Sequence, residues 1–361
     1  MSATTSPFVS QDFGAEPTPR IPRSVGFWLL ICCAMVLAMA VIGAITRLSE
    51  SGLSIMEWAP FSGILPPLSQ AEWQRLFDLY RQIPEYQQIN AGMSLEEFKT
   101  IFWWEYVHRL WGRLIGLVFA LPLAWFWLRG HIDRPLGKKL LLALALGGAQ
   151  GLLGWFMVAS GFAERTDVSQ YRLTAHLALA LIIYTYLFWL ALGVLWPRPE
   201  RSHDVAVTGL RRALSGMLAL VAVTIVSGGF VAGLNAGLTY NTFPLMDGEI
   251  IPRGYGDLSP WIANLFENIA AVQFNHRLLA VATVILALGL WLWSLSRDIS
   301  PAAQGGFAAL AILALIQLAL GVTTLLLAVP IALGALHQAG AILVLTATLW
   351  TLYHLRCRRA P

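Results

Sequence analysis

The sequence predicts an all-α polytopic membrane protein, with eight transmembrane helices arranged as two pseudo-symmetric four-helix bundles. The first observation is composition: 57% of the 361 residues are hydrophobic and only 12% are charged, about half the charged share of a soluble domain. The second is a series of long apolar runs, and the third is a set of sequence markers that occurs twice in the same order. Because a soluble chain of this length needs more polar surface, the composition excludes a soluble globular protein.

The apolar runs are long enough to cross a bilayer as helices, which takes about 20 residues each. They lie at 25–46, 104–128, 139–160, 170–195, 210–233, 266–295, 303–327 and 332–355. Their Leu, Ala and Val content fits helices, and none of them shows the alternation expected of a barrel strand. We therefore expect eight membrane-spanning helices and no spanning sheet.

The positions of the Lys and Arg residues indicate the orientation. With a cytoplasmic N-terminus, the inner segments hold most of them: Arg20, Arg23, Arg129, Arg134, Lys138, Lys139, Arg198, Arg201, Arg211, Arg212, Arg297, Arg356, Arg358 and Arg359. The outer loops hold fewer, offset by carboxylates: Arg47, Arg75, Arg81, Lys99, Arg165 and Arg253. Both termini are therefore predicted to be cytoplasmic. The first twenty residues lack the apolar core of a signal peptide and the Arg-rich pattern of a transit peptide, which favours a bacterial inner (plasma) membrane.

These spans divide the chain into tails, a linker and two halves. The predicted parts are a cytoplasmic N-terminal tail (1–24), an N-terminal four-helix half (25–196), a cytoplasmic linker (197–209), a C-terminal four-helix half (210–355) and a cytoplasmic tail (356–361). No disulfide is expected, because Cys32 and Cys33 lie in an apolar run and Cys357 lies in the basic tail.

Two predicted outer loops are long. The first, at 47–103, contains "AEWQRLFDLYRQ", whose apolar residues recur at helical spacing and predict an amphipathic helix at the membrane interface. The same loop contains "SLEE" at 94–97, which is typical of a capping box and predicts a helix that starts at Ser94 and continues into the second span. The second long loop, at 234–265, is rich in Gly and Pro.

The two halves of the chain share markers in the same order. "HRL" occurs at 108–110 and at 276–278, and "GLSIMEWAP" from Gly52 matches "GLTYNTFPL" from Gly237. The remaining pairs are Gln150 with Gln317, Gly154 with Gly321, and His176 with His337. Together these markers predict a duplicated four-helix unit. The repeat is parallel, because four spans return the chain to its starting side.

Four histidines fall within the first turns of the even-numbered spans, all of which run from outside to inside. They are His108, His176, His276 and His337. An imidazole inside a bilayer is costly unless it has a partner. Interhelical hydrogen bonds are one explanation, and ligation between facing helices of a bundle is the other. Two histidines per site in apolar surroundings, with few Cys or Asp residues nearby, suit a heme iron better than zinc.

Charged residues near these histidines distinguish the two halves. Arg109, Arg113, Arg172 and Arg277 are placed to pair with heme propionates, although they could also extend to lipid phosphates. Glu105 precedes His108 by three residues, whereas Gln273 holds the matching place before His276. A carboxylate at this depth suggests a role in proton transfer or ligand binding, or an ion pair with an arginine. The difference predicts one electron-carrying heme and one heme on which chemistry is done.

At these residues the chain resembles the heme A synthase family over nearly its whole length. The matching stretches are "TRLSESGLSIMEWAPFSGILPP" at 46–67, "FWWEYVHRLWGRLIG" at 102–116, "TAHLALAL" at 174–181, "GLTYNTFPLMDG" at 237–248, "FNHRL" at 274–278 and "LHQAG" at 336–340. The chain lacks the outer-loop cysteine pair of one branch and so resembles the alphaproteobacterial and mitochondrial type. Mechanisms that need that cysteine pair are not expected here.

The resemblance implies a reaction and a distribution of roles. Heme O would be oxidised at its C8 methyl group to a formyl group by successive hydroxylations, giving heme A for cytochrome c oxidase. A heme b would be ligated by His276 and His337, and the substrate heme iron by His108 and His176. Glu105 would take the place of the family's essential glutamate. The implied partners are heme O, an unidentified electron donor, heme O synthase, membrane lipid and a second copy of the chain, with no nucleic acid.

Two other function classes fit the same residues less well. A di-heme membrane electron-transfer cytochrome b would use the four histidines, but it does not explain Glu105, the unequal halves or the long outer loops. A transporter built on a repeat would show interrupted helices and charges near the middle of the membrane, and the sequence shows neither.

Overall fold

The structure is a computed structural model that describes residues 21–58, 62–162, 166–197 and 205–355. Its transmembrane helices are α1 (Arg23–Leu48), α4 (Leu95–Leu128), α5 (Arg134–Val158), α6 (Gln170–Leu195), α7 (Val205–Gly233), α8 (Ile269–Leu295), α9 (Pro301–Leu326) and α10 (Ile331–His354). Within the described ranges these eight helices are long and apolar enough to span a bilayer, and no strand is formed. The predicted all-α membrane fold is confirmed.

Some sequence predictions fall outside the described residues. They are the tail 1–20, linker residues 198–204, the tail 356–361 and the orientation markers Arg20, Arg165, Arg198, Arg201, Arg356, Arg358 and Arg359.

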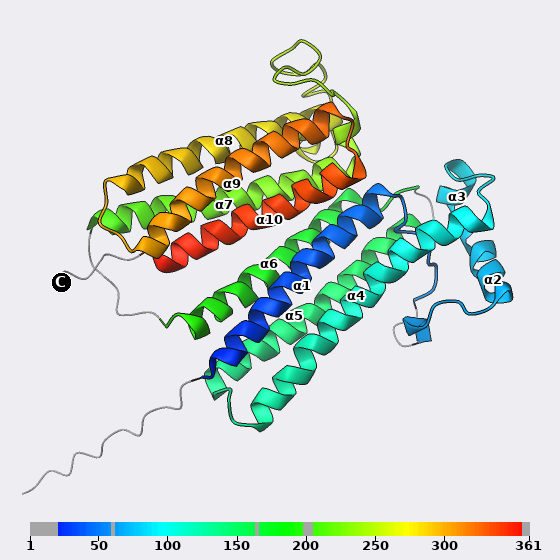
Figure 1. The fold of residues 1–361 in the computed structure, drawn as a ribbon. Coiled ribbons are helices and arrows are strands. Elements are labelled where there is room, and N and C mark those ends of the chain that lie inside the picture. The colour runs from blue at the N-terminus through cyan, green and yellow to red at the C-terminus, as the bar shows by residue number, and fades with distance from the viewer. Residues whose placement is uncertain (1–20, 59–61, 163–165, 198–204, 356–361) are drawn as a thin grey trace, which may run out of the picture.

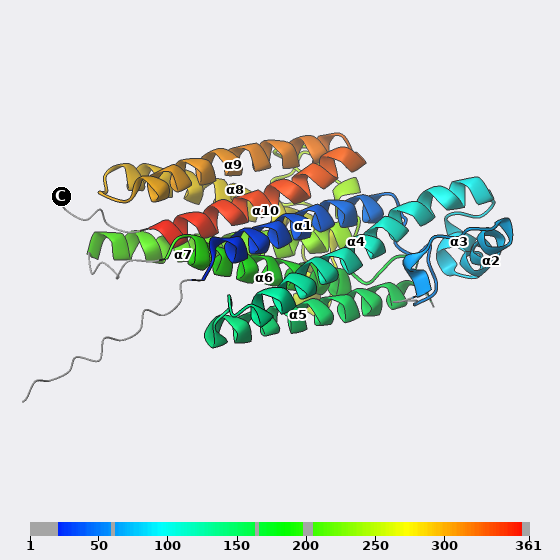
Figure 2. The same ribbon diagram turned by 60° about the horizontal axis from the view of Figure 1, so that its bottom comes forward.

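The helices form two bundles of the same arrangement that lie side by side (Figure 1). In the first bundle α1, α4, α5 and α6 pack in a ring in that order, and in the second α7, α8, α9 and α10 do the same. The bundles meet where α1 packs on α10 and α6 packs on α7, a pairing that a twofold rotation preserves. In the turned view of Figure 2, α9 and α10 lie above α1, and α4 and α5 lie below it. The predicted pair of pseudo-symmetric bundles is therefore confirmed.

Small residues and side-chain hydrogen bonds join the two bundles. Gly229 and Gly233 on α7 lie directly against Thr174 and Gln170 of α6, so that a Cβ at either glycine would be 3.0 Å or closer to its neighbour. Such close approach is the usual basis of helix association in lipid, where the hydrophobic effect gives little drive. The Tyr184 hydroxyl lies 2.7 Å from the Thr346 hydroxyl and links α6 to α10.

Most connections between helices gather at one end of the bundles, which we call the loop end. It carries the short helices α2 (Gln70–Tyr80) and α3 (Pro84–Gln88), and the 3-10 turns η1 (Ser62–Ile64), η2 (Ala159–Gly161), η3 (Ala236–Leu238) and η4 (Trp261–Leu265). α1 begins and α10 ends at the opposite end (Figure 1). At the loop end Arg47 of α1 pairs with Asp167 at 3.2 Å and donates to Asn235 at 3.0 Å, which ties the two halves together.

Helix α4 starts well before the predicted membrane segment at 104–128. Ser94 and Glu97 form the capping box that the sequence predicts, and the helix then runs unbroken through Pro122. The amphipathic segment becomes α2, which buries Leu76, Phe77 and Tyr80. Phe77 and Tyr80 pack on Phe98 of α4, with ring centroids 5.1 and 5.3 Å apart. α2 is therefore held by α4 itself.

Other helix starts also differ from the predicted spans. α5 begins at Arg134 rather than 139, because the Asp133 side chain accepts a hydrogen bond from the Leu136 amide. α8 begins at Ile269 rather than 266, because the side chain of Asn268 accepts a hydrogen bond from the Ala271 amide and so caps the helix. α7 begins at Val205, within the predicted linker, so the segment between the halves is shorter than the sequence suggests.

Candidate functional site

The four histidines lie near the loop end, one on each of α4, α6, α8 and α10. Within each bundle the two helices that carry them are diagonal, because α5 packs between α4 and α6, and α9 packs between α8 and α10. Each pair therefore faces the interior of its own bundle. The structure thus brings His276 together with His337, as the repeat predicts.

The second bundle holds its histidines with their Nε2 atoms free of protein partners. The ring centroids of His276 and His337 are 6.4 Å apart and the rings are nearly perpendicular. Nδ1 of His276 lies 2.8 Å from the Ser227 hydroxyl, and Nδ1 of His337 lies 3.1 Å from the Gln317 amide. Gln317 also donates to the carbonyl of His337 at 2.8 Å. No hydrogen bond joins either Nε2 to the part of the chain that the structure describes.

This geometry fits a metal held between the two rings. Metal–imidazole bonds are about 2 Å long, so an iron bound to both rings would hold their centroids about 6 Å apart. Histidine ligands usually engage a protein group through the second ring nitrogen, which fixes their orientation. Ser227 is placed for that role at His276. At His337 the Gln317 NH2 group is a donor toward Nδ1, so it orients the ring without accepting a proton from it.

The first bundle holds its histidines differently. Gln150 donates to the carbonyl of His176 at 3.0 Å, as Gln317 does to His337, but its amide nitrogen lies 3.3 Å from Nε2 of the ring. Nδ1 of His108 and Nδ1 of His176 are buried and lack a hydrogen-bond partner among the described residues. An unsatisfied buried polar atom costs about 1–3 kcal/mol. The His108 ring is therefore less firmly fixed by the protein than the rings of the second bundle, whereas Gln150 holds the His176 ring through Nε2.

Each histidine ring packs against a glycine on a neighbouring helix. A Cβ built at the glycine would lie close to Cε1 of the ring, at 3.1 Å for Gly43 and His108, 2.9 Å for Gly154 and His176, 3.1 Å for Gly228 and His276, and 2.7 Å for Gly321 and His337. The four helices that carry none of these histidines thus each supply one glycine. The sequence repeat revealed Gly154 and Gly321 but not Gly43 and Gly228, which an alignment of the first and fifth spans would have found.

Glu105 is buried and fully engaged at the loop end. Its carboxylate accepts hydrogen bonds from the Ser54 hydroxyl at 2.7 Å and from the Ile55 amide at 2.6 Å, and it pairs with Arg109 at 2.6 Å. Arg109 also donates to the carbonyls of Ile55 and Glu57. Glu105 and Arg109 together hold the first outer loop on α4. The ion pair considered from the sequence is present, and the loop contacts are additional.

Gln273 and Arg277 hold the second outer loop in the same way. The Gln273 amide donates to the carbonyls of Ala236 and Thr239 and accepts from Arg277 at 2.9 Å. Arg277 also donates to Thr242 and Tyr240. The first loop offers donors to position 105, whereas the second offers acceptors to position 273. A carboxylate suits the first environment and an amide suits the second, which gives the Glu–Gln difference a structural cause.

The arginines predicted to meet propionates lie at the loop end with the histidines. Arg172 donates to the Phe156 carbonyl at 2.7 Å and stacks over the ring of Phe156 at 3.7 Å. Arg113 is half-buried and lies one turn beyond Arg109 on α4. Arg109, Arg172 and Arg277 thus each give donors to backbone carbonyls, which the sequence reading did not anticipate.

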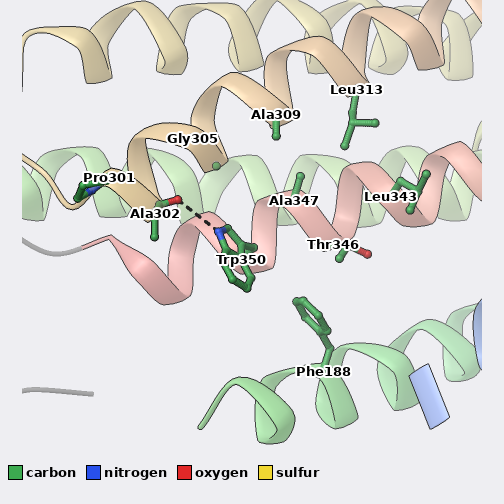
Figure 3. Close-up of a pocket in the computed structure, with 11 residues that line it drawn as sticks. Phe188, Pro301, Ala302, Gly305, Ala309, Leu313, Leu343, Thr346, Ala347 and Trp350 are labelled. Atoms are coloured by element: carbon green, nitrogen blue, oxygen red, sulfur yellow. Dashed lines mark hydrogen bonds between the residues drawn. The ribbon is translucent and has the colours of Figure 1, made fainter. Parts of the chain in front are cut away.

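A separate hollow of about 430 Å³ lies at the opposite end of the second bundle. Figure 3 shows it between α6, α9 and α10, where Trp350 donates to the Ala302 carbonyl at 3.3 Å. Its lining is apolar apart from Thr346 and carries no titratable side chain.

Comparison with known proteins agrees with this geometry. A family model described as "Cytochrome oxidase assembly protein" matches residues 26–349. A relative from Nitrosospira multiformis named "Heme A synthase" is 51% identical over 336 residues, 93% of this chain and 94% of its own length. One of the same name from Rhodospirillum centenum is 50% identical over 357 residues, 99% of this chain and 95% of its own. A third, from Rhizobium meliloti, is 48% identical over 331 residues, 91% and 89% of the two chains.

Proposed function

We infer that this chain, which belongs to the heme A synthase family, is a membrane oxidoreductase that converts heme O to heme A. The observation that carries this inference is the identity of about half of all residues to heme A synthases over nearly the full length of both chains. The paired histidines in each bundle supply the chemistry that heme binding requires.

We propose that the C-terminal half, 210–355, holds a heme b between His276 and His337. The support is the 6.4 Å separation of the ring centroids and the two Nδ1 atoms held by Ser227 and Gln317. A heme with two histidine ligands supplies one-electron transfer when bound. The protein's part is to orient both rings through Ser227 and Gln317, and Ser227 can accept the Nδ1 proton of His276 so that its Nε2 atom is available.

We propose that the N-terminal half, 25–196, binds heme O between His108 and His176. The support is that both rings keep a buried Nδ1 without a hydrogen-bond partner among the described residues. Fewer fixed contacts suit a substrate that must enter and leave.

The reaction changes one methyl group of the substrate. Two successive hydroxylations convert the C8 methyl group to an alcohol and then to a gem-diol, which loses water to leave the formyl group. We propose that Glu105 handles protons near this group, since its carboxylate is the buried acid closest in sequence to His108. Its hydrogen bonds to Ser54 and Ile55 would keep it in place between turnovers.

We propose that Arg109, Arg113, Arg172 and Arg277 neutralise heme propionates at the loop end. Nε of Arg277 is buried and has no hydrogen-bond partner among the described residues, so it retains a donor for such a group. Arg109, Arg172 and Arg277 also brace backbone carbonyls, which would hold their guanidinium groups near the outer surface.

The orientation and partners complete the proposal. Described cations near the end opposite the loops, including Arg129, Lys138, Arg212 and Arg297, favour a cytoplasmic location for that end in a bacterial inner membrane. Oxidation of the methyl group removes electrons from the substrate, so the reaction requires an oxidant, and the predicted electron donor would serve to reduce that oxidant during hydroxylation; neither is identified. Delivery of heme O by its synthase, contact with lipid and self-association stay predictions.

Pigment analysis tests the function directly. The chain would be expressed in cells that make heme O but no heme A, and extracted hemes would be separated by chromatography. We expect heme A to appear only when the chain is present. Heme b alone, bound to a chain that folds and inserts, would instead support an electron-transfer cytochrome b.

A further inference from the structure

Ser227 places a hydroxyl group on α7 beside His276. Its Oγ lies 2.8 Å from Nδ1 of His276 and donates a hydrogen bond of 2.7 Å to the carbonyl of Thr224, one turn earlier. The Thr224 hydroxyl in turn lies 3.1 Å from the Thr283 hydroxyl on α8. Hydroxyl groups thus connect α7 to α8 immediately beside the histidine.

The two hydrogen bonds of Ser227 determine which nitrogen of His276 carries the proton. A hydroxyl group has one hydrogen, and Ser227 gives it to the Thr224 carbonyl. Toward His276 the oxygen therefore acts as an acceptor, so Nδ1 is the protonated nitrogen. Nε2 then keeps its lone pair, which is the form of the ring that binds a metal.

The first bundle has no equivalent of this hydroxyl. Gly228 contacts His276 as Gly43 contacts His108, so the two glycines occupy matching places in the repeat. The residue before Gly228 is Ser227, and the residue before Gly43 is Ile42. In agreement, Nδ1 of His108 is buried without a hydrogen-bond partner among the described residues.

We propose that Ser227 is a positioning residue that fixes His276 with a protonated Nδ1 and so sets the electron affinity of the heme in the C-terminal half. The proposal rests on the assignment of heme b to that half. A ring that donates through Nδ1 is a more basic ligand, which stabilises the ferric iron and lowers the reduction potential. Ile42, at the matching position in the N-terminal half, has no hydroxyl group that could fix the Nδ1 proton of His108 in the same way.

The test compares three variants of the full-length chain, purified in detergent with its heme. Ser227→Ala removes the acceptor, Ser227→Thr keeps it, and Ser215→Ala removes a hydroxyl from the same helix that bonds only to the Arg211 carbonyl. For each variant one would measure heme b per chain, the reduction potential by redox titration, and the electron paramagnetic resonance spectrum of the ferric heme.

Ser227→Ala is expected to shift the potential to a more positive value and to change the ferric spectrum, while Ser227→Thr and Ser215→Ala match the parent. Loss of heme from Ser227→Ala alone would support the proposal equally. An unchanged potential and spectrum in Ser227→Ala would overturn it, as would equal shifts in the Ala and Thr variants. None of these readouts depends on heme A formation. A parent chain without heme b would overturn the site assignment and this inference together.

Discussion

Glu105 is a single residue whose position beside His108 could be predicted from the sequence but whose contacts could not. Its presence beside His108, and the Gln273 at the matching place, were visible in the sequence. The donors that surround it were not, because Ser54 and Ile55 lie some fifty residues earlier and only the folded loop brings them to α4. The carboxylate therefore has a structural role in holding the loop in addition to the proton role proposed for it.

Replacing Glu105 with Gln separates these two roles. Ser54 and Ile55 donate to one oxygen of Glu105 and Arg109 donates to the other. Gln keeps one acceptor oxygen, so its NH2 group must face either the loop donors or Arg109, and the negative charge is lost. We therefore expect the loop at 49–58 to loosen and heme A formation to fall by at least tenfold. Heme b content should be unchanged. Chromatography of extracted hemes and hydrogen exchange of the loop would measure both effects. If Glu105→Gln kept its heme b and formed heme A at the full rate, the proposal that Glu105 handles protons would be wrong.

Glu85 predicts a pH dependence of stability. Burial, together with the nearby carboxylates of Glu105 and Glu50, raises the pKa of this carboxyl on α3 to about 8. Between the ordinary value of 4.5 and about 8 the folded state binds more protons than the unfolded state. Stability should therefore fall as the pH rises through this window.

Thermal unfolding of the purified chain between pH 5 and pH 8.5 would measure this fall, and Glu85→Gln should flatten it. Glu96→Gln is the matched control, because the Glu96 side chain is 79% exposed. Equal pH slopes for the parent chain and Glu85→Gln would contradict the buried, protonated carboxyl.

At the scale of whole helices, the apolar runs predicted every span, since about 20 apolar residues have few alternatives in lipid. The boundaries depended on caps: Ser94 was recognised in the sequence, whereas Asn268 was not. Most of the contacts between helices could not be predicted from the sequence. Gly43 and Gly228 look like ordinary small residues of an apolar helix, and only the packed bundle shows that each faces a histidine.

Replacing Gly321 with Ala tests this packing. A Cβ there would lie 2.7 Å from Cε1 of His337, so the ring must move. The helix itself should gain stability, since Ala is favoured over Gly by about 1 kcal/mol. We therefore expect a weakened or spectrally altered heme b in a chain that is at least as helical as the parent. Gly305→Ala on the same helix, where nothing lies within 4 Å, serves as control and should leave the heme unchanged. Identical heme spectra for both variants would contradict the contact.

At the scale of the whole molecule, the chain uses one four-helix unit twice and lets the copies differ in a few places. Both bundles carry diagonal histidines, a glycine against each ring, and an arginine that ties an outer loop to its helix. The repeat was predictable because its markers keep their order in the sequence. The differences at Ser227 and Ile42, and the opposite hydrogen-bonding characters of the two outer loops, required the structure.

The most direct test of this division of labour is heme chromatography on two purified double variants, His108→Leu with His176→Leu, and His276→Leu with His337→Leu. Both would be prepared from cells that supply heme O. The account predicts that the first variant keeps heme b but holds neither heme O nor heme A, and that the second loses heme b. Loss of heme b from the first variant, with retention in the second, would contradict it.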